Sequence, residues 1–422
     1  MPYSSAPQLG TRSLLPGDAL ERFHLNHFFI YTIEDLNALP RSTLLWTQVF
    51  PSYAQRASCI RHAAIALGAT HWLFLTCATQ TTHLLRFAAD QYYEAIKAVI
   101  PLMSGRDAMG IEHVLLCCLL FVLLESLRGN QAEALRHLEA GYRLFTEQSG
   151  DTVESPDNVI GCLFATFQRL GTEASLFAEK RLLPDTPTPW TQSRHKRCQT
   201  SHQSSRSFSL GGILDDLSEL YGVYNCLSWR LDMGLTGKAW PTPERAHFEE
   251  QIRMWRSNVR LTIADLPNDS TSIMNQQLIV FLDLQHRTLD AVLRDIINPG
   301  ELLSPDECHQ MLDQVETLLA LVPARPTFSI RSYIVPSLIF LYGYCLNFQI
   351  RQRVIHLLRR HRRHEVVWNS EAVAQFFEND LNNRLMGLCP PDWPDIGPSS
   401  NNENALLVFR PREDGFLSTM GS

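Results

Sequence analysis

Residues 114–145, which read VLLCCLLFVLLESLRGNQAEALRHLEAGYRLF, decide the fold. The stretch begins with eleven consecutive apolar residues, 114–124. A membrane-spanning helix needs about 20 apolar residues, whereas a helix that is apolar on every side is typical of a buried position in a large core. The stretch therefore predicts a central core helix rather than a membrane anchor.

The second part of this stretch predicts a helix hairpin. Arg128 falls in the last turn of the first helix, where the helix dipole favours a cation. Gly129 suits the left-handed backbone conformation that commonly follows a helix. A second helix then carries one apolar side, formed by Leu135, Leu138, Tyr142 and Phe145. Two helices joined by so short a connection are expected to pack antiparallel.

Apolar residues recur at helical spacing along most of the chain. The clearest segments are residues 57–74, 87–100, 278–297 and 308–321. The last of these follows Ser304 and Pro305, a cap and a first-turn proline that favour a helix start. Residues 328–335 are compatible with a strand or with a buried helix. The predicted fold is all-α, a multi-helix bundle built as an array of antiparallel helix hairpins.

One central segment breaks the helical pattern. Residues 184–212 are rich in Ser, Thr, Pro and Gln, a composition that cannot bury enough apolar surface to offset the entropy of ordering. We therefore predict five parts. They are a disordered N-terminus (1–18), an N-terminal helical half (19–183), a disordered linker (184–212), a C-terminal helical half (213–389) and a flexible tail (390–422).

Composition narrows the function classes. The chain has 422 residues, 45% of them hydrophobic, which is enough for a large core. Its net charge of −7 disfavours nucleic-acid binding through bulk charge. None of the ten cysteines forms a C-x-x-C pair, so zinc-finger spacing is absent. The N-terminus has no apolar signal core, so we expect a protein that is not secreted.

The common catalytic motifs are missing from the sequence. It contains no G-x-S-x-G elbow, no P-loop and no G-x-G-x-x-G. Cys117 and Cys118 lie inside the apolar run, where thiols are expected to be buried and unreactive.

The sharpest catalytic candidate is the segment DDLSE, with Asp215, Asp216 and Glu219. It resembles the aspartate-rich magnesium motif of class I terpene synthases, and hard cations do prefer carboxylate oxygens. A second segment resembles that family's other metal motif through Asn268, Asp269, Ser272 and Gln276.

Two observations favour a solvated helix face over a metal site. Pro267 places the second segment at a helix start. In the first segment, the carboxylates project to a different side from an apolar stripe that includes Leu214, Leu217, Leu220 and Tyr221. A magnesium-dependent all-α enzyme remains the alternative.

The basic run RRHRRH, residues 359–364, has two interpretations. It is compatible with a nuclear-import or phosphate-binding patch. We favour cations that close a helix, although both can hold. The histidines in and beside the run are not predicted to bind a metal, because the neighbouring arginines repel cations. We predict no catalytic, cofactor-binding or metal-binding residues.

Several segments together resemble the regulatory domain of the fungal-specific transcription factor domain family. They are ERFHLNHF (21–28), LW (45–46), RHAAIALGATH (61–71), residues 93–100, the hairpin stretch and RQRVIHLLRRHRRHEVVWN (351–369). The resemblance extends from Ala19 to Leu385. In the family this all-helical domain usually follows a binuclear zinc cluster of six cysteines, which contains two C-x-x-C pairs.

The sequence departs from the family pattern in lacking that cluster, since its first cysteine is Cys59. The resemblance therefore implies a nuclear (alternatively cytoplasmic) role in transcription without sequence-specific DNA binding by these residues. It implies a partner, either a zinc-cluster regulator or another transcription component, with a small-molecule effector and a secondary-metabolite gene cluster as further expectations. No membrane association is expected. A helical scaffold without a regulatory role is a third alternative.

Overall fold

The computed structural model describes residues 16–36, 45–76, 82–103, 108–147, 159–174, 213–214, 216–217, 220–221, 242–265, 273–297, 303–322, 325–330, 334–366 and 368–386. These residues are mostly helical, which confirms the predicted fold class. The predictions for the linker (184–212) and the tail (390–422) lie outside the described residues, as do those for residues 1–15.

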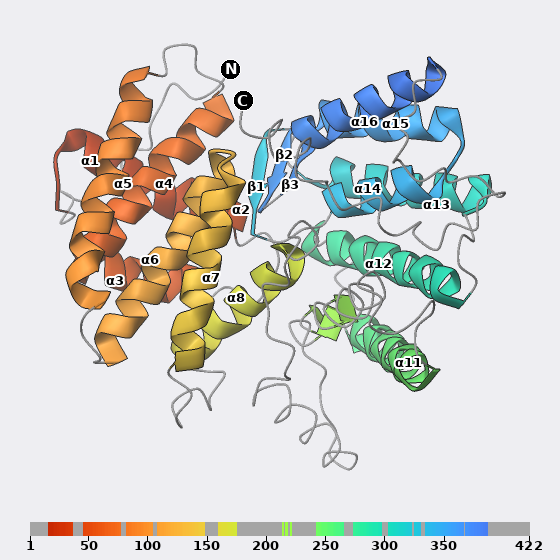
Figure 1. Ribbon diagram of the computed structural model, residues 1–422, viewed down its shortest axis with the longest axis horizontal. Helices are drawn as coiled ribbons and strands as arrows, with labels where there is room; N and C mark the ends of the chain where they lie inside the picture. The colour runs from red at the N-terminus through yellow and green to blue at the C-terminus, as the bar shows by residue number, and fades with distance from the viewer. Residues whose placement is uncertain are drawn as a thin grey trace.

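The helices form an N-terminal and a C-terminal group, which lie side by side in Figure 1. The N-terminal group contains α1 (Ala19–His27), η1 (Phe28–Thr32), α2 (Ile33–Leu36), η2 (Leu45–Val49), α3 (Phe50–Arg56), α4 (Ser58–Thr76), α5 (Thr82–Met103), α6 (Ala108–Leu127), α7 (Gln131–Glu147) and α8 (Val159–Ala174). The C-terminal group contains α11 (Thr242–Asp265), α12 (Ile273–Ile297), α13 (Pro305–Ala320), α14 (Val335–Tyr344), α15 (Phe348–Arg360) and α16 (Ser370–Leu385).

Helix α6 is the core helix that the apolar run predicts. Every residue from 114 to 124 is buried, and α6 packs against α4, α5, α7 and α8. The helix extends beyond the run to 20 residues. Among the described residues, its segment Gly110–Leu127 alone has the length and apolar composition to cross a membrane, but 83% of that segment is buried inside the protein. Burial rather than length therefore identifies α6 as a core helix.

The predicted hairpin joins α6 to α7. Gly129 adopts φ +82°, the left-handed conformation expected after a helix. The carboxylate of Glu125 ties the turn together, because it accepts hydrogen bonds from Arg128 (3.1 Å) and from the Asn130 side-chain amide (2.6 Å). On α7, Leu138, Tyr142 and Phe145 are buried and Leu135 is partly buried. The predicted apolar side of α7 is confirmed.

Local capping fixes two helix starts. Ser304 caps α13, as expected from the sequence. The structure adds a reciprocal capping box, in which the Ser304 backbone N–H donates to the Glu307 carboxylate at 2.9 Å. Asp18 and Glu21 form the same arrangement at the start of α1. The carboxylate of Glu21 also accepts a hydrogen bond from Gln91 of α5 (2.8 Å), so this cap connects α1 to a neighbouring helix.

A small sheet lies between the two helix groups (Figure 1). Strand β1 (Thr327–Ser329) pairs in parallel with β2 (Arg363–Glu365), which pairs antiparallel with β3 (Trp368–Asn369). The segment 328–335 was expected to be a strand or a buried helix. It begins in strand β1 and ends at the first residue of helix α14, so both forms occur in it. The strands are two or three residues long, too short to give a period-two pattern in the sequence.

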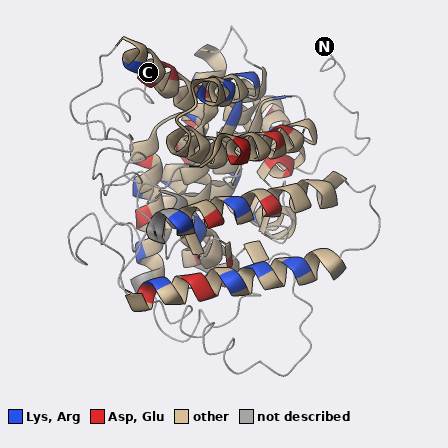
Figure 2. Cartoon of the chain, turned by 90° about the vertical axis from the view of Figure 1, so that its right-hand side faces the viewer, with Lys and Arg blue, Asp and Glu red and all other residues tan. Residues whose placement is uncertain are grey.

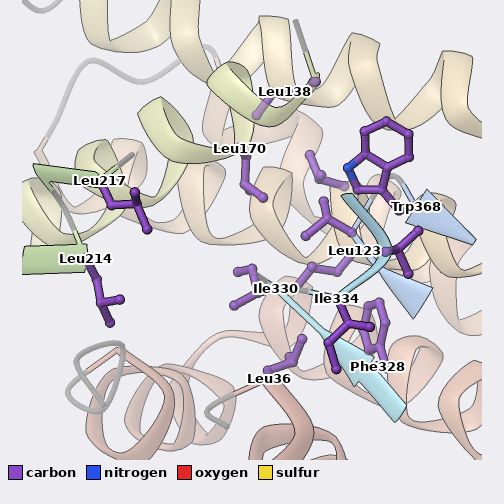
Figure 3. Close-up of a cluster of buried hydrophobic side chains, with 14 of the residues drawn as sticks. Leu36, Leu123, Leu138, Leu170, Leu214, Leu217, Phe328, Ile330, Ile334 and Trp368 are labelled. Atoms are coloured by element: carbon purple, nitrogen blue, oxygen red, sulfur yellow. The ribbon is translucent and has the colours of Figure 1, made fainter. Parts of the chain in front are cut away.

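The apolar core is continuous from one helix group to the other. Figure 3 shows Leu36, Leu123, Leu138 and Leu170 from the N-terminal group together with Phe328, Ile330, Ile334 and Trp368 from the sheet and its connections. Burial of shared apolar surface holds the two groups together.

Candidate functional site at the junction of the helix groups

An ionic network with a buried aspartate and a partly buried arginine crosses the junction between the two helix groups. Asp35 on α2 lies between His71 on α4 and Arg325, which precedes β1. The Arg325 guanidinium donates to both Asp35 oxygens, at 2.7 and 2.8 Å. The His71 Nε2 atom lies 3.2 Å from Asp35 Oδ2, and the Phe328 backbone N–H also donates to this oxygen. We call Asp35, His71 and Arg325 the junction network.

The second nitrogen of His71 faces two further buried groups. Its Nδ1 atom lies 2.9 Å from the Thr32 hydroxyl and 3.3 Å from Nε2 of His27. Because the Asp35 carboxylate only accepts hydrogen bonds when ionised, we assign the His71 proton to Nε2. Nδ1 is then the acceptor for Thr32. This assignment fixes the orientation of the His71 ring.

The surroundings favour an ionised Asp35 and a neutral His27. Burial alone would raise the pKa of Asp35, but the hydrogen bonds from His71 and Arg325 outweigh it and hold this pKa below its usual range. Burial, followed by the neighbouring His71, lowers the pKa of His27 to about 3. His27 is therefore neutral near pH 7.

A glycine allows the helices at the site to approach closely. A Cβ atom at Gly68 of α4 would collide with the backbone carbonyl of His24 on α1. The absence of a side chain lets α1 lie directly on α4, and this approach brings His27 to His71. Burial lowers the pKa of His24, on the same helix, to about 4.

A second set of contacts fastens α6 to the sheet. The Ser126 hydroxyl at the end of α6 donates to the backbone carbonyl of Val366 and lies 3.3 Å from His364 Nε2. Next to it, the buried Glu365 carboxylate accepts from Arg363 (3.0 Å) and from the first backbone N–H groups of α14. Burial lowers the pKa of His364 to about 4, so this residue is also neutral.

The order Asp35, His71, Thr32 is that of an orienting acid, a base and a hydroxyl, as in nucleophilic hydrolases. Such chemistry requires access for a substrate. His71 and Thr32 have no exposed surface, and Asp35 is 7% exposed. The arrangement joins α2, α4 and β1, and we interpret it as a structural clamp.

The candidate magnesium motif is described only in part. Asp215, Glu219, Asn268, Asp269 and Ser272 lie outside the described residues. Asp216 is half-buried and Gln276 is exposed. In the described part of the predicted apolar stripe, Leu214, Leu217 and Leu220 are buried and Tyr221 is partly buried, as expected. The part of the chain that the structure describes holds no group of three His, Cys, Asp or Glu side chains arranged for a metal ion.

The basic run at 359–364 is divided between a helix end and the interior. Arg359 closes α15, as predicted, and its guanidinium pairs with Glu378 at 2.7 Å. Arg362 lies over the ring of Phe74, 4.8 Å from its centroid, and so adds another contact across the junction. Arg363 and His364 are buried in β2. Most of the run therefore serves internal contacts.

The paired cysteines of α6 are buried, as expected. Cys117 has no exposed surface and Cys118 is 9% exposed. Burial raises the pKa of Cys118 to about 12 and also raises the pKa of Cys117. Both are thiols near pH 7, so they are poor nucleophiles.

The outer face of α11 and α12 carries charges of both signs (Figure 2). Many are paired, as in Arg245 with Glu249 at 3.6 Å and Arg287 with Asp283 at 3.4 Å. A nucleic-acid groove would require clustered, uncompensated cations. This face lacks the charge distribution for phosphate binding.

The sequence comparisons identify the family. A family model described as the fungal specific transcription factor domain matches residues 23–373. The chain belongs to this family. The matched region begins within α1 and ends within α16, so it includes both helix groups and the junction network.

Two curated relatives of this fungal transcription factor domain are transcription regulators. The aspercryptin biosynthesis cluster-specific transcription regulator atnN of Emericella nidulans is 34% identical over 120 residues, which are 26% of this chain and 20% of the relative. The transcription regulator lscL of Purpureocillium lilacinum is 22% identical over 239 residues, 52% of this chain and 55% of the relative. The matches thus span a fifth and about half of the relatives' lengths. No solved structure matches the chain.

The residues of the junction network were not predicted from the sequence of this fungal transcription factor domain. A signal was present for His71, which follows Ile60 and Leu67 on the apolar side of α4, where all three are buried. A histidine at a core position needs a hydrogen-bond partner. The sequence does not identify that partner, because Asp35 lies 36 residues from His71, and Arg325 lies 290 residues from Asp35.

Proposed function

We propose that the protein regulates transcription of a limited set of genes through contacts with other transcription components, in the nucleus. The observation that carries this proposal is the family match over residues 23–373. The regulators atnN and lscL support it, and the printed name of atnN motivates a link to a biosynthetic gene cluster. We infer that its role is non-catalytic.

The proposal assigns sequence reading to a zinc cluster outside these 422 residues, carried by a partner regulator. Two observations support that division of roles. The sequence contains no C-x-x-C pair, and its net charge is −7. A protein that reads DNA by itself needs phosphate-neutralising cations and side chains that reach the bases.

The junction network gives this proposal a structural basis. It connects the helix groups by bidentate ionic contact, so the two groups present their outer helices as one body. A partner or a small effector that binds one group would then act on both.

Deletion of the gene tests the regulatory role. We expect altered transcript levels for a limited gene set, restored by the wild-type gene and by a control with the exposed substitution Arg353→Ala. A variant with the junction broken, Asp35→Ala, should restore them poorly. Affinity purification from nuclei should recover a zinc-cluster regulator or another transcription component. An unchanged transcriptome accompanied by loss of a metabolite would reject the regulatory proposal.

Two experiments with the purified chain test the alternatives. We expect no sequence-specific footprint on DNA at physiological salt, and a footprint at a defined site would remove the need for a DNA-reading partner. We also expect no release of pyrophosphate from prenyl diphosphates with magnesium. Release that Asp215→Asn abolishes would establish the enzyme alternative instead.

A further inference from the structure

Helix α5 has an apolar stripe on its outer side. Leu85, Tyr93, Ile100 and Met103 are 50–63% exposed, and the exposed Ala89 lies between them. At 3.6 residues per turn these five positions fall within about a quarter of the helix circumference. Their spacing is that of the seam along which two helices pack.

The opposite side of α5 accounts for its contacts within the chain. Ala88, Gln91, Ala95 and Val99 are buried, and the helix packs on α4 and α6. The hydroxyl of Tyr92 also reaches His137 of α7 at 2.8 Å. The helix is therefore anchored by one side while its stripe faces outward. In Figure 1, α5 lies at the left-hand flank, on the other side of the molecule from α11.

Charges beside the stripe identify a fitting partner. Asp90 and Lys97 are exposed, lie on the same edge of the stripe and are separated by two helical turns. If a second α5 packs antiparallel, the two-fold axis between them brings Asp90 of each copy close to Lys97 of the other. A parallel pair would instead place like residues at the same height. Asp90 and Lys97 are thus complementary to the same two residues of a second copy in the antiparallel orientation.

We propose that α5 is a self-association surface, on which a second copy of this chain packs antiparallel through the apolar stripe and two symmetric Asp90–Lys97 ion pairs. Ala89 then lies opposite Ile100 of the second copy, and Tyr93 lies opposite its Ile96. This inference is independent of the proposed regulatory role.

The size of the surface sets the strength of the dimer. Helix α5 has 22 residues and is about 33 Å long. A strip of one helix that is about 10 Å wide buries less than the roughly 800 Å² per partner of a standard interface. We therefore expect a weak dimer whose population rises with concentration in the micromolar range.

Charge reversal tests the proposal on the full 422-residue chain. Sedimentation at about 1 to 100 μM should show a shift from single to double mass. Lys97→Asp and Asp90→Lys should each weaken the dimer about tenfold, because each variant creates two like-charge pairs. The double variant Asp90→Lys/Lys97→Asp should restore dimerisation. Restoration distinguishes a lost contact from a damaged fold.

Arg253→Asp on α11 is the matched control. Arg253 is an exposed arginine paired with Glu250 at i,i+3, as Lys97 is with Glu94 at 3.5 Å, and the reversal changes the net charge by the same amount. We expect it to leave the dimer unchanged. Single mass for the wild type at every concentration would overturn the proposal. So would equal effects of the control and Lys97→Asp, or failure of the double variant to restore the dimer.

Discussion

Helix α6 and the centre of the junction network, Asp35 and His71, are both buried, but opposite kinds of chemistry stabilise them. In α6, eleven consecutive apolar residues are removed from water, and any well-fitting apolar neighbour can satisfy them. In the junction network, the Asp35 carboxylate needs specific donors at hydrogen-bond distance, which are His71 and Arg325. Apolar burial therefore gives α6 its stability, whereas the ionic network fixes which parts of the chain meet.

The largest effect is expected in α6. Leu119→Asp places an unpaired carboxylate among residues that have almost no exposed surface. Because a buried, unpaired charge costs several kcal/mol or more, we expect the purified variant to be unfolded by circular dichroism. The matched change Leu119→Met should cost less than about 1.5 kcal/mol. A soluble aspartate variant with an unchanged melting temperature would mean that α6 is not a core helix.

A smaller but still large effect is expected at the junction network. Asp35→Ala removes the acceptor for Arg325 and His71 and leaves both without their ionic partner. We expect a loss of about 3–5 kcal/mol, measured by chemical denaturation. The double variant Asp35→Ala/Arg325→Ala should lose less stability than the sum of the two single losses, because the residues form one network. Additive losses would contradict the network.

The buried histidines should make stability depend on pH. His27 and His364 have folded-state pKa values of about 3 and 4, below the usual value of 6.5. The unfolded chain therefore binds more protons, and stability should fall as pH decreases below about 6.5. Each should contribute roughly 1 kcal/mol between about pH 7 and 5.5.

Chemical denaturation at pH 7 and at pH 5.5 measures this pH dependence of stability, and His364→Gln should reduce it. Stability that is flat between pH 7 and 5.5 would show that the histidines are not buried neutral groups.

Asp35 should affect stability at lower pH than the histidines. Its pKa is held below the usual range, so its stabilisation is present above about pH 4 and is lost as the carboxyl is protonated at lower pH.

The smallest effect is expected at an exposed ionic pair. Arg353 of α15 pairs with Asp313 (2.8 Å) and Glu316 (2.9 Å) of α13, in geometry comparable to that of Arg325. Solvent screens these groups, since the side chain of Asp313 is 68% exposed. Arg353→Ala should therefore cost less than about 1 kcal/mol in the same denaturation experiment. A loss of stability as large as that of Asp35→Ala would contradict the expectation that exposed ion pairs are weaker than buried ones.

The sequence predicted those parts of the fold that local rules determine. The apolar run of α6, the left-handed Gly129 and the helix start at Ser304 and Pro305 all depend on residues within a few positions of one another. The sheet was not predicted as a unit, because its strands are very short and β1 pairs with a strand about 36 residues later. The predicted absence of catalytic and metal residues stays a prediction.

By itself, the sequence determined that this chain is helical, that α6 is central and that its segments resemble a transcription-regulator domain. Periodicity and capping act over one or two helical turns, so they can be read directly. Only the tertiary structure decided that Asp35, His71 and Arg325 form one network. Each of them is an ordinary polar residue in its local sequence. Their function arises only when folding removes water and leaves them one another as partners.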